Sequence, residues 1–105
     1  MSEDQIHLYI IQCGCSRYHK IGVSTYPGDR LEALQTANPM KLSLRFAIAI
    51  PNESAIERYL HKKYQKQNIR GEWFDLSEND VASIRTYIKS LFWKKVGRPQ
   101  KTVTA

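Results

Sequence analysis

The chain has 105 residues, and 16 lysines and arginines against 10 aspartates and glutamates give it a net charge of +6. This length predicts one domain with a modest core, and a hydrophobic content of 42% is typical of a globular rather than a disordered protein. No apolar run approaches the ~18 residues of a membrane span, and the acidic N-terminus MSEDQ lacks the apolar segment of a secretory signal. We therefore expect a cytoplasmic protein without a membrane partner, and the oligomeric state stays open.

The first half of the chain predicts two strands, a helix and a third strand. Valine, isoleucine and tyrosine are enriched over residues 6–12 and 17–24, and the turn between them contains Gly14, which can adopt unusual backbone angles. A helix is expected over residues 29–38, because the residue that precedes a proline disfavours helical angles. Residues 42–50 alternate large apolar with small or polar side chains, which predicts a strand with one apolar face. Its apolar positions are Leu42, Leu44, Phe46, Ile48 and Ile50.

The second half predicts two helices around a short extended segment. Ile56, Leu60 and Tyr64 form an apolar row at helical spacing within residues 53–67. The segment GEWFD over residues 71–75 reads as extended, and its phenylalanine is expected to close the core.

A last helix is predicted from Ser77, whose spacing to Asp80 suits reciprocal capping, to about Trp93. We expect one domain over residues 1–94. The basic tail over residues 95–105 has no periodicity and is expected to be mobile. Its sequence GRP resembles the core of an AT-hook, a minor-groove arm, but valine stands where an arginine is usual, and a solvated tail is the alternative.

Most of the cations lie in residues 53–70 and 77–105. Clustered cations form an electrostatic footprint for a polyanion, most often nucleic acid, and the alternative is a solvated basic surface. We expect DNA as the partner. A partly exposed Trp73 would stack on a base, and the alternative for this side chain is a place in the core. The candidate nucleic-acid-binding residues are Lys62, Lys63, Lys66, Arg70, Trp73, Lys94, Lys95 and Arg98.

Cys13 and Cys15 are the only cysteines, and one glycine separates them. This spacing is too tight for a comfortable disulfide, and the two thiols with His19 do not supply the four ligands of structural zinc. The simpler interpretation is a turn with reduced cysteines.

Three polar residues stand out near the first two strands. Because side chains alternate between the faces of a strand, a hairpin that turns Leu8 and Ile21 inward places Tyr9 and Lys20 together on its other face. Arg30 lies in the first turn of the next helix, where the helix dipole disfavours a cation. Such an arginine suggests a phosphate clamp, and an ion pair with a neighbouring acid is the alternative.

These residues carry a resemblance to a known family. The tripeptides HLY at residues 7–9 and KIG at residues 20–22 resemble the paired motifs of the GIY-YIG nuclease superfamily, with Arg30 at the position of the family's arginine. The later segments AIERYLHKKY and RGEWFDL resemble its small phage and bacterial DNA-binding-domain branch (meiotically up-regulated gene-like). The resemblance covers about residues 6–93. It implies an α+β fold in which a small three-stranded antiparallel sheet is flanked by helices, in the order β-β-α-β-α-(β)-α.

The resemblance also implies a function, that of a metal-dependent endonuclease that hydrolyses phosphodiester bonds in DNA. Tyr9 would accept the proton of the attacking water, and Lys20 would lower the pKa of Tyr9. Arg30 would clamp the phosphate, and Glu57 would hold Mg²⁺ or Mn²⁺. His61, one helical turn after Glu57, would contact phosphate or water. These five residues are the candidate catalytic residues.

Two features leave alternatives open. Lys20 replaces the tyrosine usual in the second tripeptide, and Tyr18 on the same strand face can supply the missing ring. Ser54 and Glu57 have the spacing of a capping box, in which the glutamate bonds to the helix N-cap instead of a metal. The alternative function is a non-cleaving DNA-binding module on the GIY-YIG fold, and a protein-interaction domain is a third possibility.

Overall fold

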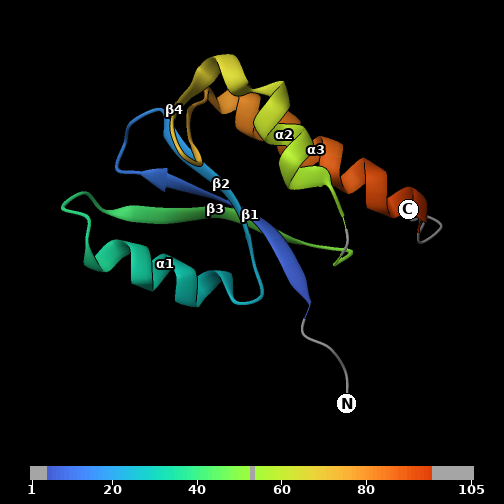
Figure 1. Ribbon diagram of the computed structural model, residues 1–105, viewed down its shortest axis with the longest axis horizontal. Coiled ribbons are helices and arrows are strands. Elements are labelled where there is room, and N and C mark those ends of the chain that lie inside the picture. The colour runs from blue at the N-terminus through green and yellow to red at the C-terminus, as the bar shows by residue number, and fades with distance from the viewer. Residues whose placement is uncertain (1–4, 53, 96–105) are drawn as a thin grey trace, which may run out of the picture.

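The computed structural model describes residues 5–52 and 54–95. The elements follow the predicted order, with a short 3₁₀ helix (η1) and one further strand added (Figure 1). They are β1 (Ile6–Cys13), β2 (Tyr18–Ser24), α1 (Pro27–Thr36), β3 (Leu42–Ile50), α2 (Ile56–Lys63), η1 (Gln65–Gln67), β4 (Asn68–Arg70), β5 (Trp73–Asp75) and α3 (Glu78–Lys95).

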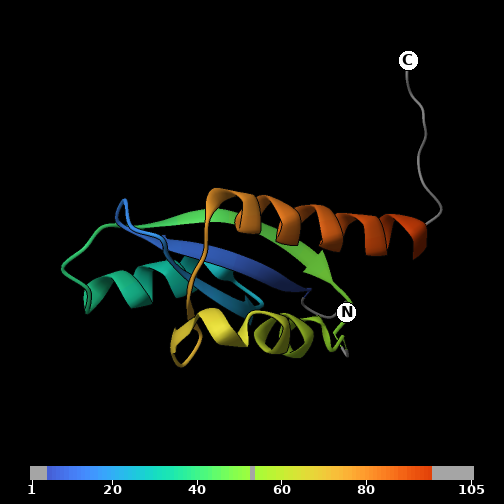
Figure 2. The same ribbon diagram turned by 90° about the horizontal axis from the view of Figure 1, so that it is seen from above.

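The strands form one antiparallel sheet in the order β3-β1-β2-β5-β4. Helix α1 covers one face, and α2 and α3 lie on the other side (Figure 1). Seen from above, α3 lies nearest β3 and α2 lies nearest the edge of β2 (Figure 2). The α+β class is confirmed, but the sheet has five strands rather than three.

Consecutive residues of β1 enter two separate apolar layers. Leu8 and Ile10 are buried with residues of α2 and α3, whereas Tyr9 and Ile11 pack in a second layer with Leu31 of α1. The register pairs Tyr9 with Gly22 and Ile11 with Lys20, so the predicted face of the hairpin is correct. Because both faces are covered, this strand reads as a continuous apolar run.

Strand β3 departs from the predicted alternation at a β-bulge. The residues of β3 that pair with consecutive residues of β1 are Phe46 and Leu44, so Arg45 is an extra residue, and two hydrogen bonds to the Glu78 carboxylate, 2.6 and 3.0 Å long, hold its side chain. A shift of one residue reverses the face of a strand. Leu42 therefore packs under α1 while Phe46 packs on the opposite face, and the expectation of one shared face is wrong.

Two helix starts differ from those predicted, and one cap is confirmed. Helix α1 begins at Pro27, because proline suits the first helical position. Helix α2 begins at Ile56, later than predicted, and η1 forms the end of the predicted helix. At the start of α3 the Ser77 amide donates to the Asp80 carboxylate and the Asp80 amide donates to the Ser77 hydroxyl, both at 3.0 Å.

The sequence predicts only a loop over residues 68–70, but these residues form β4 and pair with β5. Gly71 turns the chain with a φ of 54°. The Asn68 amide group donates to the carbonyls of Gly71 and Trp73 at 2.9 and 3.1 Å and so fixes the turn. Phe74 is buried, as expected, and its strand adds to the edge of β2.

No helix within residues 5–52 and 54–95 combines the length and apolar character that a membrane crossing requires. The predicted tail, with its GRP sequence, lies outside the described residues except for Lys95, the last residue of α3.

His19 has a structural environment that makes stability depend on pH. Its side chain is buried, its Nδ1 lies 2.8 Å from the Arg17 carbonyl, and Arg45 Nη1 approaches its Nε2 at 3.4 Å. Burial lowers the pKa of His19 below its usual 6.5. Below about pH 6.5 His19 of the unfolded chain binds a proton more readily than His19 of the folded chain. The free energy of unfolding is therefore expected to decrease as the pH decreases.

Urea unfolding at several pH values tests this expectation on the wild type and on His19→Gln. The variant should lose part of the wild-type decrease in unfolding free energy below about pH 6.5. Identical pH dependence in the two proteins would contradict the role given to His19.

Candidate functional site

The candidate site lies where β2 runs past its neighbour β5. Strand β5 pairs with β2 only through residues 18–20. At the next residue, the Ile21 amide donates to the Glu72 carbonyl at 3.0 Å, and the Ile21 carbonyl lies 2.8 Å from His61 Nε2. Helix α2 and the β4–β5 turn therefore meet at this point of the sheet edge.

Glu57, His61 and Glu72 bring their potential ligand atoms within 4.8 Å of one another, the only such group of histidine, cysteine and acidic residues in the described chain. Glu57 and His61 are one turn apart on α2, with Nε2 and Oε2 separated by 4.0 Å. The bond to the Ile21 carbonyl requires a proton on His61 Nε2, so this nitrogen is a donor and not a ligand. The two carboxylates are the potential oxygen ligands of the group.

The Tyr9 phenol joins this group by passing over Gly22, its partner in the hairpin. A Cβ atom on Gly22 would lie 2.6 Å from the Tyr9 hydroxyl and 3.2 Å from Glu72 Oε1. The Tyr9 hydroxyl and Glu72 Oε1 therefore both lie next to the Cα of Gly22, on the same face of β2. The glycine of the second tripeptide is needed here because any side chain would displace the phenol.

Lys20 pairs with Glu72 and not with Tyr9. Its ammonium lies 2.7 Å from Glu72 Oε1, and only 14% of its side chain is exposed. The same ammonium lies 5.9 Å from the centre of the Trp73 ring. Lys20 thus fixes Glu72 beside the phenol. The carboxylate of Glu72 offsets the positive charge of Lys20 that was expected to act on Tyr9.

The pKa of Tyr9 is raised to about 12, the opposite of the predicted shift. Burial is the main cause, since the side chain is 1% exposed, and the negative charges of Glu72 and Glu57 add to it. Arg30 acts in the other direction and lowers this pKa, so its guanidinium shares the electrostatic environment of the phenol. The expectation that Lys20 lowers the pKa of Tyr9 is wrong.

Glu57 lies beside a second carboxylate and does not cap its helix. Burial, and then the charge of Glu72 and a hydrogen bond to it, raise the Glu57 pKa, while His61 and Lys20 lower it. Ala55 rather than Ser54 is the N-cap of α2, and the Ser54 amide donates to the Pro51 carbonyl. The capping-box alternative is therefore excluded.

A family model of the T5orf172 domain matches residues 6–89, from β1 into α3. The chain belongs to the T5orf172 domain family. This small domain occurs in phage and bacterial nucleases and DNA-binding proteins. No curated protein and no solved structure matches the chain.

In this T5orf172 domain, the five candidate catalytic residues come from three parts of the fold. Tyr9 and Lys20 lie on one face of the β1–β2 hairpin, Arg30 lies on α1, and Glu57 and His61 lie on α2. Contacts or electrostatic influences link four of them to Glu72, and Arg30 is linked to this group only through its effect on the pKa of Tyr9.

The candidate DNA-binding cations are spread more widely. Lys62 and Lys63 are exposed on α2, but helical geometry turns both away from the side that carries Glu57 and His61, and Lys63 lies over the Tyr64 ring. Lys66 in η1 is also exposed. Of the remaining cations, Arg70 is exposed on β4, Lys94 and Lys95 belong to the last turn of α3, and Arg98 lies outside the described residues.

Glu72 is the member of the site that sequence reasoning missed. It lies in the segment RGEWFDL between Gly71 and Trp73 and reads as part of a structural element. A signal was present in Lys20, a cation within an apolar strand, since a buried cation needs an acidic partner. Its partner is 52 residues away in the sequence, and local spacing does not reveal that distance.

The cysteines of this T5orf172 domain form no disulfide. Gly14 between them has a φ of 58°, which confirms the predicted turn geometry. Neither cysteine belongs to the potential metal-binding group found among the described residues.

Gly22→Ala is expected to lower any activity of the site about 10²-fold, because the new methyl group displaces the Tyr9 phenol by about 1 Å. Overpacking should also reduce the free energy of unfolding by about 1–3 kcal/mol. Gly28→Ala is the matched control, since a Cβ at Gly28 meets no atom within 4 Å. Thermal unfolding and a cleavage assay on both variants test this, and equal behaviour of the two would contradict the packing role of Gly22.

Proposed function

We propose that this T5orf172 domain is a metal-dependent endonuclease of the GIY-YIG type that hydrolyses phosphodiester bonds in DNA. The observation that carries the proposal is the meeting of the Tyr9 phenol with two carboxylates, Glu57 and Glu72, at the open edge of β2. The sequence resemblance and the net charge of +6 support a nucleic-acid substrate.

The donor set fits a divalent cation. The ligand atoms of Glu57 and Glu72 lie within 4.8 Å of one another, and the charge of Glu72 is, after burial, a cause of the raised pKa of Glu57. A cation held between the two carboxylates would offset this repulsion. Carboxylate oxygens are the ligands that Mg²⁺ and Mn²⁺ take in proteins. The bound cation would supply positive charge where the phosphate oxygens become more negative in the transition state.

The protein side chains supply the remaining functions. Tyr9, as the phenolate, accepts a proton from the water whose oxygen attacks the phosphorus, and the bond from phosphorus to the leaving oxygen breaks while that oxygen takes a proton from solvent water. Arg30 donates hydrogen bonds to the phosphate oxygens. Lys20 holds Glu72 in place through the 2.7 Å ion pair, and His61 orients α2 through its bond to the Ile21 carbonyl.

The pKa of Tyr9 makes this chemistry dependent on the cation. A phenol with a pKa of about 12 is almost fully protonated at neutral pH. Neutralising Glu72 and Glu57 would remove two of the causes that raise this pKa, and Arg30 already lowers it. A cation held by the carboxylates would therefore lower the pKa of Tyr9 and increase its phenolate fraction, although burial, the largest cause of the raised pKa, would remain.

The test is cleavage of supercoiled plasmid and of branched oligonucleotides by the purified chain in Mg²⁺, Mn²⁺ or EDTA. Metal-dependent nicking is the expected result. Tight DNA binding without cleavage in any divalent metal would overturn the nuclease proposal.

That second result would select the other candidate, a non-cleaving DNA-binding module on the same fold. The high pKa of Tyr9 and the replacement of the second motif's usual tyrosine by Lys20 favour it. Such a module would bind DNA with an affinity that falls steeply as salt increases, because cation–phosphate contacts release counterions.

A further inference from the structure

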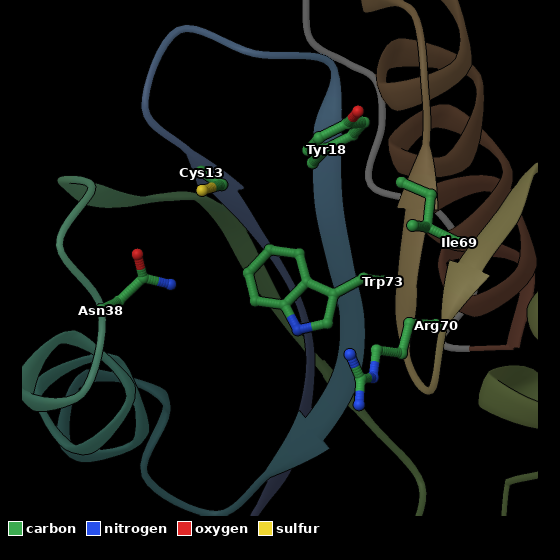
Figure 3. Close-up of a pocket in the computed structure, with 6 residues that line it drawn as sticks. All are labelled: Cys13, Tyr18, Asn38, Ile69, Arg70 and Trp73. Carbon is green, nitrogen blue, oxygen red and sulfur yellow. The ribbon is translucent and has the colours of Figure 1, made fainter.

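A pocket of about 220 Å³ opens beside the candidate site, on the face of the sheet that α1 covers. Figure 3 shows the Trp73 indole crossing the middle of this pocket, with Tyr18 and Arg70 at its sides and Asn38 facing it from beyond the end of α1. Its lining residues are Cys13, Tyr18, Asn38, Ile69, Arg70 and Trp73.

The pocket combines exposed apolar side chains with unused hydrogen-bond donors. Tyr18 and Ile69 are 49% and 48% exposed, so both offer apolar surface to a ligand in the pocket. Within the described residues, the Arg70 guanidinium makes no ion pair or hydrogen bond, and the Asn38 side chain uses only its Oδ1, which accepts from the Met40 amide at 2.9 Å. A ligand with a flat apolar face and a polar edge would pack on the apolar side chains and accept hydrogen bonds from the Arg70 and Asn38 donors.

This pocket adjoins the proposed catalytic group. Arg70 and Trp73 lie on the same hairpin turn as Glu72, on either side of it. The Lys20 ammonium connects the two regions, since it lies 2.7 Å from the Glu72 carboxylate and 5.9 Å from the centre of the Trp73 ring. A group bound in the pocket is therefore a close neighbour of a phosphate bound at the site.

We propose that the pocket holds the base of one unpaired nucleotide next to the phosphate that is cleaved, an inference that rests on the proposed function. The π-face of the base stacks on Trp73, as bases do on aromatic residues of single-strand-binding proteins. The Asn38 Nδ2 group donates to an acceptor on the edge of the base, and Arg70 contacts the adjoining phosphate.

The proposal narrows the substrate class. A base within an intact duplex is paired and stacked, so it enters such a pocket only after an unfavourable extrusion. DNA that already contains an unpaired nucleotide, such as a flap, a bulge or a single strand, avoids this cost. The preferred substrate is therefore DNA with unpaired nucleotides at the cleavage point.

The experiment measures binding of the full chain to a dye-labelled duplex with a short single-stranded flap, in EDTA so that no cleavage occurs. The same DNA is prepared with a single abasic residue at each flap position in turn. At one position, loss of the base should weaken binding about fivefold or more. Millimolar free deoxynucleoside monophosphate should not displace the flap DNA.

A protein variant then assigns the effect to the pocket. Trp73→Leu should weaken binding of the intact flap about fivefold or more but leave binding of the abasic flap unchanged, and Trp73→Phe should restore most of the loss. Tyr59→Leu is the matched control, because Tyr59 is an exposed aromatic residue outside the pocket whose ring contacts Tyr87.

The outcomes separate this inference from the function on which it rests. Equal binding of intact and abasic flaps at every position, or an equal loss for both in Trp73→Leu, would overturn the base pocket while DNA binding stands. Displacement by the free nucleotide would make the pocket a mononucleotide site instead. Failure to bind any of the DNA molecules would overturn the proposed function as well.

Discussion

Glu57→Gln is expected to lower the rate of DNA cleavage about 10³-fold, because the loss of one of two carboxylate ligands removes several kcal/mol of charge stabilisation from the transition state. The fold should be no less stable than the wild type. The raised pKa of Glu57 means that the folded chain holds the proton more tightly, so at neutral pH the charged carboxylate destabilises the fold. A neutral amide removes that cost.

This pairing of lost activity with unchanged or increased stability distinguishes a functional carboxylate from a structural one. Cleavage rates and urea unfolding of Glu57→Gln and of Glu32→Gln, an exposed position on α1, provide the comparison. Glu32→Gln should match the wild type in both measurements. A Glu57→Gln variant that cleaves DNA at the wild-type rate would remove the carboxylate from the mechanism.

Tyr9→Phe is expected to lower the cleavage rate by about 10²- to 10⁴-fold, the usual contribution of a general base. The substitution removes only the hydroxyl, so the ring still fills the layer that it shares with Ile11 and Leu42. Tyr64→Phe is the matched control, because Tyr64 is also a buried tyrosine with a raised pKa but packs on the opposite face of the sheet. It should cleave at the wild-type rate.

The pH dependence of the wild type tests the same role. The active form of the base is the phenolate. A bound cation would offset the charges of Glu72 and Glu57 but leave burial, the largest cause of the raised Tyr9 pKa, in place, so the phenolate fraction should still rise about tenfold for each pH unit around neutrality. The logarithm of the cleavage rate should therefore increase with pH with a slope near one, within the range in which the fold is stable. A flat profile around neutral pH, or full activity of Tyr9→Phe, would exclude Tyr9 as the base.

The sequence predicted the elements whose patterns are local. The apolar runs of β1 and β2 and the alternation of β3 determine three strands, and the spacing of Ser77 and Asp80 determines the start of α3. The bulge at Arg45 reversed the face of Leu42, because the register of a strand depends on its partner as well as on its own pattern.

In the candidate site, too, the sequence predicted what depends on local pattern but not what depends on distant segments of the chain. The hairpin alternation correctly grouped Tyr9 with Lys20 on one face. The sequence did not reveal that Lys20 pairs with Glu72, or that burial outweighs the charge of Arg30 in setting the pKa of Tyr9. Both depend on segments far apart in the chain, since β5 must add to β2 before the Glu72 carboxylate can reach the phenol.

The central claim is that one divalent cation binds between Glu57 and Glu72 beside the Tyr9 phenol. Anomalous diffraction from crystals of the full chain grown with Mn²⁺ and a non-cleavable phosphorothioate DNA measures this directly. The predicted result is a single strong Mn²⁺ peak in contact with both carboxylates and with an oxygen of the bound phosphate. A crystal in which DNA is bound but no Mn²⁺ peak lies beside Glu57 and Glu72 would contradict the claim.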